Sequence, residues 1–318
     1  MTPAALDTLQ QHLLTALANA PDEVRRLFHG RGHRWPGLES ITVDWLQGVL
    51  LVTLFRQPAE AELADLKQRL LALAESAAWR ERNGQKLLLQ HRYRADSASE
   101  FLLGEPVDHW PVSEHGLRFK LDLGRNQNSG LFLDMRYGRR WVQQQAQGKR
   151  VLNLFAYTCA FSVAAIAGGA LHVLNLDMAK GPLTRGRDNH RLNGHDLGKV
   201  GFLGHDLFKS WGKISKCGPY DLIIVDPPSF QKGSFVLTQD YRKVLRRLPG
   251  LLSEQGQVLA CLNDPAIGAD FLLEGMAAEA PGLVFQRRLD NPPEFADSFP
   301  GGGLKVLVFH QGSTDQNP

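Results

Sequence analysis

The chain has 318 residues, 43% of them hydrophobic, which is enough to bury two cores of ordinary size. Its 36 Lys and Arg nearly balance its 33 Asp and Glu, so the formal net charge of +3 does not by itself identify an acidic partner. No apolar run approaches the roughly 18 residues that cross a bilayer, and the opening MTPAALDTLQQ lacks the basic region of a secretory signal. We therefore expect a cytoplasmic protein that inserts into no membrane.

Three cysteines, Cys159, Cys217 and Cys261, are an odd number and form no CxxC pair. This usage is typical of a reducing compartment and offers neither a disulfide framework nor a zinc site. The segment HGRGH, His29 to His33, has the spacing of metal ligands, but its two glycines disfavour a helix that presents both rings on one face. We expect no bound metal.

The first part of the chain predicts a helix followed by a small α+β domain. Leucines at helical spacing predict an amphipathic helix within residues 1–20. ITVDWLQGVLLVTLF predicts two strands that meet at a Gln-Gly turn, a second amphipathic helix begins at Pro58, and KLLLQHRYR and LRFKLDL add further strands. The α+β domain is expected over residues 21–112.

Basic residues are concentrated in parts of the chain. Between Trp79 and Arg150, thirteen Lys or Arg stand against eight Asp or Glu, and RRLFHGRGHRW and YRKVLRR add further arginines. Two interpretations stay open. These segments are either solvated faces, where Lys and Arg usually lie, or a surface that follows the phosphates of an RNA. The second interpretation would make the domain over residues 21–112 RNA-facing.

After Gly148, short apolar strands alternate with helical segments, which predicts a doubly wound, Rossmann-like α/β sheet covered by helices on both faces. Five strands are predicted in RVLNLF, HVLNLD, VGFLGHD, DLIIVD and GQVLACLN. LVFQRRLD and LKVLVFHQ, joined by PPEFADSFPGGG, predict a closing pair. The expected sheet therefore has seven strands, mostly parallel with an antiparallel C-terminal strand, and residues 113–318 are assigned to this domain.

Three consecutive predicted strands end in an acid: Asp177, Asp206 and Asp226. Ligands of open α/β sheets bind beyond these carboxyl ends, although aspartate is also a common helix N-cap. Asp177 follows Asn153 at close to the spacing of about 20 residues that places an acid on ribose hydroxyls. The glycine-rich GxGxxG turn of dinucleotide sites is absent, so a nucleoside without a pyrophosphate fits better. Asp206 is then placed to accept a hydrogen bond from an adenine amino group, with Leu207 or Phe208 beside the ring.

The stretch DLIIVDPPSF ends a buried strand with an acid, two prolines and an aromatic ring. Pro227 and Pro228 fix φ and remove two backbone donors, which makes the turn stiff. Asp226 can then hold an amine or ring nitrogen, and Phe230 can stack on a base lifted out of a nucleic acid. The alternative is that the prolines only end the strand while Phe230 packs in the core.

Several segments, taken together and in order, resemble class I S-adenosylmethionine-dependent methyltransferases. Within that class they resemble the bacterial 23S rRNA large-subunit base methyltransferases of the cytosine-C5 and guanine-N7 branch. The segments are FHGRGHRWPGLESITVDWLQGVLLVTL, NQNSGLFLDMRYGRR, VLNLFAYTCAFSVAAIAGGA, LNLD, DNHRLNG, GHDLF and DLIIVDPPSF. The resemblance implies S-adenosyl-L-methionine as cofactor and 23S rRNA or a ribosomal assembly particle as partner. Many members also carry a separate N-terminal RNA-binding domain, whereas only about 20 residues precede the resembling region here.

The resemblance also implies roles for matching residues. The residues that would face the target base are Asp226, Pro227, Pro228 and Phe230. The residues that would hold the cofactor are Asn153, Phe155, Tyr157, Thr158, Asp177, Met178, Asp206 and Leu207. Four further residues would complete the cofactor pocket or position the RNA: Gln127, Ser129, Asp134 and Arg136.

Two departures from the family pattern affect these expectations. Cys159 replaces a glycine, and its added Cβ is expected to strain the loop or shift the cofactor. Methylation of cytosine C5 needs a thiolate nucleophile, but the corresponding position is Asn263, with Cys261 two residues earlier. Cys261 is either a buried, inert thiol or a contact to the base, and Asn263 resembles the guanine-N7 branch.

The resulting hypothesis is a methyltransferase that acts on a base of rRNA. The alternatives are a methyltransferase for a protein or small molecule, and a non-catalytic assembly factor that binds the cofactor and RNA. The target atom stays open, and so does the oligomeric state, a homodimer included.

Overall fold

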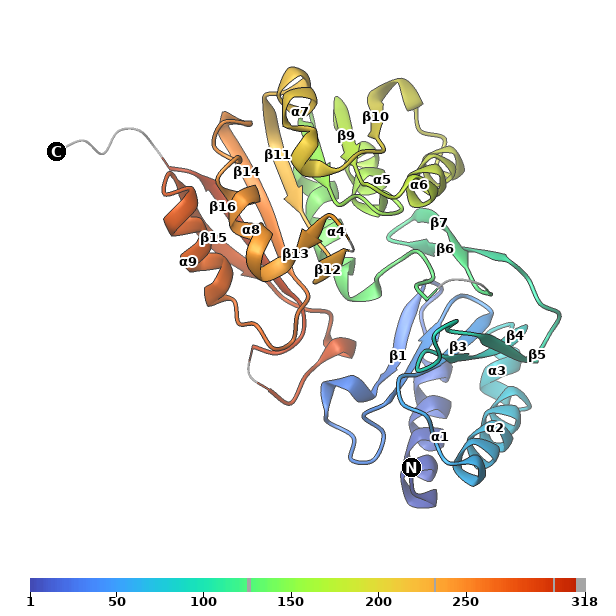
Figure 1. Ribbon diagram of the computed structural model, residues 1–318. Helices are drawn as coiled ribbons and strands as arrows, with labels where there is room; N and C mark the ends of the chain where they lie inside the picture. The colour runs from blue at the N-terminus through green and yellow to red at the C-terminus, as the bar shows by residue number, and fades with distance from the viewer. Residues whose placement is uncertain (125–126, 232, 300, 313–318) are drawn as a thin grey trace. The chain divides into compact units, whose positions relative to one another are not determined.

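The computed structural model describes residues 1–124, 127–231, 233–299 and 301–312. Over these residues the chain forms two compact units (Figure 1). The first comprises Met1–Leu133 and Pro292–Pro300, and the second comprises Asp134–Asn291 and Gly301–Pro318. The boundary expected after residue 112 falls inside strand β6, His109–Glu114. Asn126 of NQNSGLFLDMRYGRR and Pro300 of PPEFADSFPGGG lie outside the described residues.

The first unit is built on a five-stranded sheet with the order β1-β2-β3-β4-β5. Neighbouring strands are antiparallel except β3 and β4, which are parallel because helices α2 and α3 cross over between them. The strands are β1 (Arg25–His29), β2 (Ile41–Trp45), β3 (Val49–Leu54), β4 (Lys86–His91) and β5 (Ser99–Leu103). The helices are α1 (Pro3–Ala18), α2 (Glu60–Ala74) and α3 (Ala77–Glu81), and β6 pairs with β7 (Leu117–Asp122) as a separate ribbon.

Local sequence explains two turns of this unit. Gln47 and Gly48 have φ of 52° and 100°, the conformation of a two-residue hairpin turn between β2 and β3. The glycines of HGRGH lie in a short 3-10 helix, η1 (Gly30–Gly32), where backbone packs closely. A Cβ on Gly30 would lie 1.9 Å from the carbonyl oxygen of Leu38, so these glycines serve close packing.

The second unit has a seven-stranded sheet with the order β10-β9-β8-β11-β14-β16-β15. The first five strands are mutually parallel, and β16 runs antiparallel to both of its neighbours. This arrangement confirms the predicted fold class. The strands are β8 (Arg150–Leu154), β9 (His172–Leu176), β10 (Val200–Leu203), β11 (Tyr220–Val225), β14 (Leu252–Leu262), β15 (Leu283–Leu289) and β16 (Lys305–Gln311).

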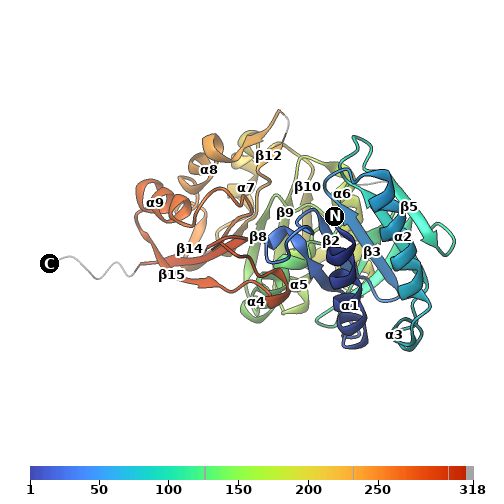
Figure 2. The ribbon, with the colours of Figure 1, turned by 90° about the horizontal axis from the view of Figure 1, so that it is seen from below.

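Helices cover both faces of this sheet, as Figure 2 shows. Leu152 packs into the core cluster that includes Ile214 of α7 and Tyr241 of α8, whereas its neighbour Val151 packs into the cluster of Trp141 on α4. The apolar strands predicted from the sequence are thus buried on two sides. The helices are α4 (Arg136–Gln145), α5 (Ala160–Ala167), α6 (Lys180–Leu192), α7 (Trp211–Cys217), α8 (Leu237–Leu245) and α9 (Asp270–Glu279).

Short elements complete the second unit. A hairpin of β12 (Phe230–Gln231) and β13 (Phe235–Val236) follows β11. The strand order reverses between β8 and β11, and such a switch point is where open α/β sheets bind ligands. Further 3-10 turns are η2 (Leu133–Met135), η3 (Leu197–Lys199), η4 (Leu207–Lys209) and, in the first unit, η5 (Pro293–Phe295). No helix among the described residues has the length and apolarity to cross a membrane.

Candidate active site

The loop after β8 turns sharply into α5. Phe155, Tyr157 and Cys159 have φ of 57°, 46° and 61°, the left-handed region that residues other than glycine rarely adopt. Such a conformation persists only where neighbouring structure holds it. Asp177, directly after β9, provides that support, because its Oδ2 accepts a hydrogen bond from the amide of Tyr157 at 2.8 Å.

Asp177 is 7% exposed, and its other oxygen, Oδ1, accepts from the amide of Ala179 at 2.8 Å. Burial raises the pKa of this carboxyl, while the two backbone hydrogen bonds oppose that rise. Each carboxylate oxygen can accept a further hydrogen bond, so the group suits the two hydroxyls of a ribose. Of the two other residues predicted nearby, Thr158 is buried and Met178 is exposed.

Asn153 on β8 begins a buried chain of hydrogen bonds. Its Nδ2 donates to Oδ1 of Asn175 at 2.9 Å, and Nδ2 of Asn175 donates to Ser162 Oγ and to the carbonyl of Gly201. Since that carbonyl can only accept, it fixes the orientation of the Asn175 amide and therefore that of the Asn153 amide. Oδ1 of Asn153 is left as a buried acceptor that finds no hydrogen-bond partner among the described residues. An acceptor there fits a donor such as the amino group of a ligand.

The expected strain at Cys159 is present in its backbone, because its φ of 61° lies in the left-handed region that favours glycine, but its side chain has space in the core. Its side chain is fully buried against α6, in a cluster with Ala156 and Leu183. The space exists because Gly186 lies opposite: a Cβ there would lie 2.4 Å from Cys159 Sγ. The side chain that replaces a glycine on one element is thus accommodated by a glycine on the next. Burial raises the pKa of the thiol, which is therefore protonated.

Asp206 follows β10 and caps the 3-10 turn η4. Its Oδ1 accepts from the amide of Phe208 at 2.8 Å, and its Oδ2 lies 4.0 Å from Lys209 Nζ. Oδ2 can still accept a hydrogen bond from a ligand. Leu207 is 2% exposed and belongs to the core, so of the two residues predicted beside an adenine only the partly buried Phe208 offers a ring face.

Asp226 follows β11 and is half-buried. Burial and the nearby carboxylate of Asp134 raise its pKa to about 7, and the guanidinium of Arg139 opposes the rise. Arg136 and Arg139 lie on α4 and are both buried. Within the described residues, no hydrogen bond or ion pair engages the Asp226 carboxylate, so it is available to a ligand. With a pKa of about 7, the group is about half ionised near neutral pH.

The turn after Asp226 ends in an exposed aromatic ring. Pro227 is buried and Pro228 partly buried, whereas 65% of Phe230 is exposed at the start of β12. The alternative that Phe230 packs in the core is therefore wrong. A solvent-facing ring on a proline-stiffened turn is available for stacking.

The end of β14 lies beside this turn. Cys261 is fully buried, and burial together with the charge of Asp226 raises the pKa of its thiol well above the ordinary value. Asn263 is exposed and accepts a hydrogen bond from Ser229 Oγ at 3.0 Å. The asparagine, not the cysteine, is thus at the surface of the site.

Sequence reasoning missed Tyr241 on α8 and Phe235 on β13. The Tyr241 hydroxyl lies 3.3 Å from the carbonyl of Val225 and 2.9 Å from that of Cys261, where it ties the ends of β11 and β14 together. Phe235 packs edge-on against Phe155 with the ring centroids 4.9 Å apart. Helical spacing identifies Tyr241 as a buried residue, but nothing in TQDYRKVLRRL shows where its hydroxyl points.

Gln127 and Ser129 belong to the first unit. The carbonyl of Gln127 accepts from Arg92 at 3.3 Å, and that of Ser129 accepts from the amide of Asp122 at 2.7 Å. Their part in holding a cofactor stays a prediction. In the described ranges, no group of three or more His, Cys, Asp or Glu is arranged to hold a metal ion.

Residues 25–310 match the sequence profile of the family described as S-adenosylmethionine-dependent methyltransferase. The chain belongs to this family. Its cofactor is S-adenosyl-L-methionine, and the nucleoside-binding features at the ends of β8, β9 and β10 fit that molecule.

Two relatives illustrate the similarity. The chain is 34% identical over 235 residues to "Ribosomal RNA large subunit methyltransferase K/L" of Shewanella baltica, covering 70% of this chain and 32% of the relative. It is 30% identical over 248 residues to "Ribosomal RNA large subunit methyltransferase I" of Erwinia tasmaniensis, covering 77% of this chain and 62% of the relative. The chain therefore spans about a third of the first relative and less than two thirds of the second.

A solved structure shares the fold. SMU.776, a protein crystallised in complex with SAH, superposes with a TM-score of 0.83 at 24% identity, covering 96% of this chain and 80% of that one. The methyltransferase fold therefore extends over nearly the whole sequence.

Proposed function

We propose that this methyltransferase modifies a base of large-subunit rRNA of the 23S type. The observation that carries the proposal is the solvent-facing Phe230 on the proline turn after Asp226. A base that leaves its stack loses a few kcal/mol, and an aromatic face beside the reactive centre offsets this cost. The names of the relatives from Shewanella baltica and Erwinia tasmaniensis support the same substrate class.

In this proposal, residues at the ends of β8 and β9 position the cofactor. Asp177 accepts from the ribose hydroxyls, Oδ1 of Asn153 accepts from the amino group, and Oδ2 of Asp206 accepts from the adenine. When bound, S-adenosylmethionine supplies an electrophilic methyl group on a sulfonium. The buried loop around Tyr157 keeps water away from that side of the site.

Asp226 acts on the target base. As a carboxylate it accepts a hydrogen bond from a base N–H and stabilises the positive charge that a base gains when a ring nitrogen is methylated. Because its pKa is about 7, we expect this form to increase as the pH rises through neutrality. Phe230 would hold the plane of the base, and Asn263 would contact its edge.

A ring nitrogen is a more suitable target than cytosine C5. Attack on C6 requires a thiolate at the site, whereas the Cys261 thiol is buried and its pKa is raised. We therefore favour the guanine-N7 type of reaction, in which the nucleophile already exists and the enzyme mainly aligns it.

The proposed setting is the cytoplasm, with RNA or a ribosomal assembly particle as partner. Light scattering would separate a monomer from a homodimer.

The test is mass spectrometry of rRNA nucleosides from cells with and without the intact gene, followed by labelled methyl transfer to purified rRNA. We expect one methylated guanosine to disappear with the gene and RNase to remove the label. Label that survives RNase would instead indicate a protein or small-molecule substrate. Cofactor binding without any labelled product would indicate a non-catalytic assembly factor.

A further inference from the structure

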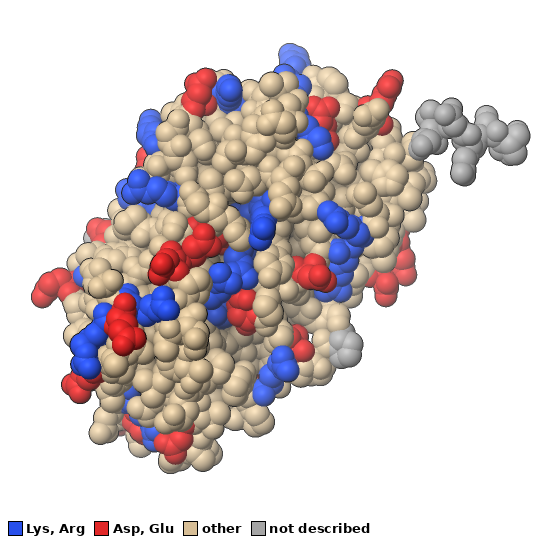
Figure 3. All heavy atoms as spheres, turned by 180° about the vertical axis from the view of Figure 1, so that it is seen from behind, with Lys and Arg blue, Asp and Glu red and all other residues tan. Residues whose placement is uncertain are grey.

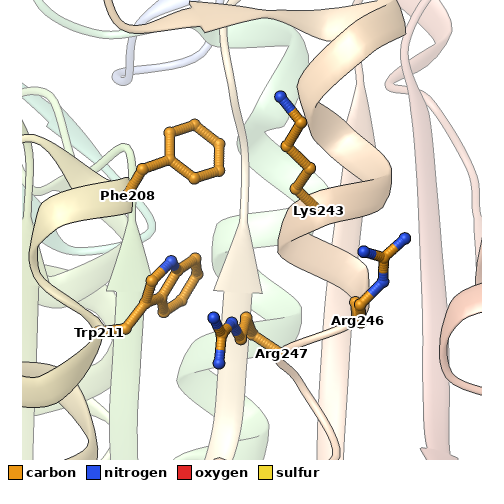
Figure 4. A pocket seen from close by; sticks show the side chains of 5 residues that line it. All are labelled: Phe208, Trp211, Lys243, Arg246 and Arg247. Carbon is orange, nitrogen blue, oxygen red and sulfur yellow. The ribbon is translucent and has the colours of Figure 1, made fainter.

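The second unit contains a pocket that shares only Phe208 with the proposed cofactor site. Its volume is about 480 Å³. Figure 4 shows the rings of Phe208 and Trp211 on one side and three basic side chains on the other, of which Arg246 points away from the rings. The rings come from η4 and the start of α7, and the cations come from α8 and the residues that follow it. The lining residues are Phe208, Trp211, Lys243, Arg246 and Arg247.

The rings and cations are arranged with room between them. Lys243 Nζ lies 5.9 Å from the centre of the Phe208 ring, and the guanidinium carbon of Arg247 lies 5.9 Å from that of Trp211. The two ring centres are 6.4 Å apart, with the planes at 70°. These distances are at the outer limit of cation–π contact, so a flat group can approach a ring without first breaking a tight pair.

The pocket carries an uncompensated positive charge. Lys243 pairs with Asp240 at 2.7 Å, and Arg246 pairs with Glu279 at 2.7 Å. Arg247 forms no ion pair within the described part of the chain and is exposed. On the face seen in Figure 3, by contrast, Lys and Arg are interspersed with Asp and Glu. A local excess of positive charge beside two aromatic rings therefore indicates a binding site for an anionic, flat ligand.

We propose that this pocket binds one nucleotide of the substrate RNA, with Arg247 and Lys243 on its phosphate and Trp211 against its base. Single-stranded nucleic acid is generally held by cations that follow the backbone and by aromatic rings that stack on bases. A nucleotide has both features, whereas an acidic peptide offers only the charge. The YRKVLRR segment, rich in arginine, thus has a specific use.

The inference rests on the proposed RNA substrate and adds a second anchoring point to it. Asp206, whose carboxylate caps η4, lies two residues before Phe208 in the chain. The same short turn therefore serves the edge of the cofactor site and one wall of the pocket.

The test uses the full chain and compares Arg247→Ala and Trp211→Ala with the matched control Arg242→Ala. Arg242 is also exposed on α8 but does not line the pocket. We expect each pocket variant to raise the KM for rRNA about tenfold, since each removes either a stacking ring or a charged contact with the phosphate. The kcat at saturating RNA and the Kd for the cofactor should stay unchanged. Arg247→Ala should also reduce the salt dependence of binding, with a slope smaller by about one.

Trp211 also packs against the core, so Trp211→Ala can disturb folding. Trp211→Phe, which keeps a ring, and the exposed Arg247→Ala test the pocket without that defect. Trp211→Phe should keep most of the RNA affinity because a ring remains. Equal KM values for the pocket variants and Arg242→Ala would overturn the inference. If the wild type methylates no RNA, the proposed function fails. The pocket is then tested separately, by measuring the binding of a labelled single-stranded oligoribonucleotide through fluorescence anisotropy. Weaker binding by Arg247→Ala than by Arg242→Ala would then support it, and equal binding would reject it.

Discussion

The loops that follow β8 and β11 lie at the same edge of one sheet but are built in opposite ways. The β8 loop is mostly buried, although Phe155 and Tyr157 are partly exposed. It has three residues in the left-handed region, and is held by the carboxylate of Asp177 and by packing against Gly186. The β11 loop has no residue with positive φ among its described members before Gly233. Its shape depends on two prolines, and it presents Phe230 to solvent.

The difference matches what the proposed function requires of each loop. A small cofactor is gripped best by a buried loop whose geometry is fixed before binding. A base of a large RNA has to enter from solvent, so its side of the site must be open yet stiff. Tyr241 contributes to this stiffness, because its hydroxyl lies within hydrogen-bond distance of the carbonyls at the ends of β11 and β14.

The largest predicted effect comes from the open loop. Asp226→Ala should lower kcat by about a thousandfold, within the range for loss of a positioned acid or base, because in the proposed function its carboxylate contacts the target base. The Kd for the cofactor should change less than about threefold, since in the proposed function Asp177 and Asn153 hold the cofactor. Labelled methyl transfer and calorimetry measure the two effects.

Asp226→Asn is the matched control, because it keeps the shape of the side chain and removes the titration. With a pKa of about 7 in the wild type, the activity should rise with pH through neutrality as the carboxylate forms, and the variant should lose that dependence. Unchanged turnover in Asp226→Ala would reject the role of this residue.

The second prediction concerns the buried loop. Asp177→Ala should weaken cofactor binding by about 10- to 100-fold, as expected when hydrogen bonds to a charged group are lost. The variant also releases the amide of Tyr157, so part of the loss reflects a looser loop. At saturating cofactor, kcat should recover to within about threefold, which distinguishes this variant from Asp226→Ala; a kcat that stays low would place Asp177 in the chemical step.

Comparison of the two loops also shows what the sequence can predict. The apolar strands and the positions of Asp177, Asp206 and Asp226 follow from short-range patterns, because strand ends in a parallel sheet lie at one edge. The consequence of Cys159 could not be predicted this way. Whether its side chain finds space depends on Gly186, which lies on another helix, and a single sequence does not pair the two positions.

A third prediction tests that pairing. Gly186→Ala should destabilise the protein by about 2 kcal/mol, a typical cost of overpacking, because the new Cβ would lie 2.4 Å from Cys159 Sγ. Thermal unfolding monitored by circular dichroism measures the change. The double variant Gly186→Ala, Cys159→Gly should recover most of the stability, since it removes the opposing side chain. Additive losses in the double variant would mean that the two positions do not share this space.

The smallest predicted effect concerns the hydrogen-bond chain behind the buried loop. Ser162 accepts from Asn175, so its hydroxyl is free to donate to Nε2 of His190 at 2.9 Å. Nδ1 of His190 must then carry the proton that faces Nδ1 of His195 at 3.0 Å. This arrangement needs a neutral His190, and burial, with a contribution from His195, lowers its pKa to about 3.

The sign of the pH effect follows from this lowered pKa. Below pH 6.5 His190 is protonated in the unfolded chain but stays neutral in the folded chain. The free energy of unfolding therefore falls as the pH decreases. Between pH 7.5 and pH 5 the loss should be about 2 kcal/mol. Urea unfolding of the wild type and of His190→Gln at both pH values measures this loss. Groups of the first unit, such as His29 with its pKa lowered to about 4, contribute equally to the pH dependence of both proteins, so their contributions cancel. Equal pH dependence in the two proteins would show that His190 is not held neutral, and the cofactor loop would then lack the rigid support that distinguishes it from the loop after β11.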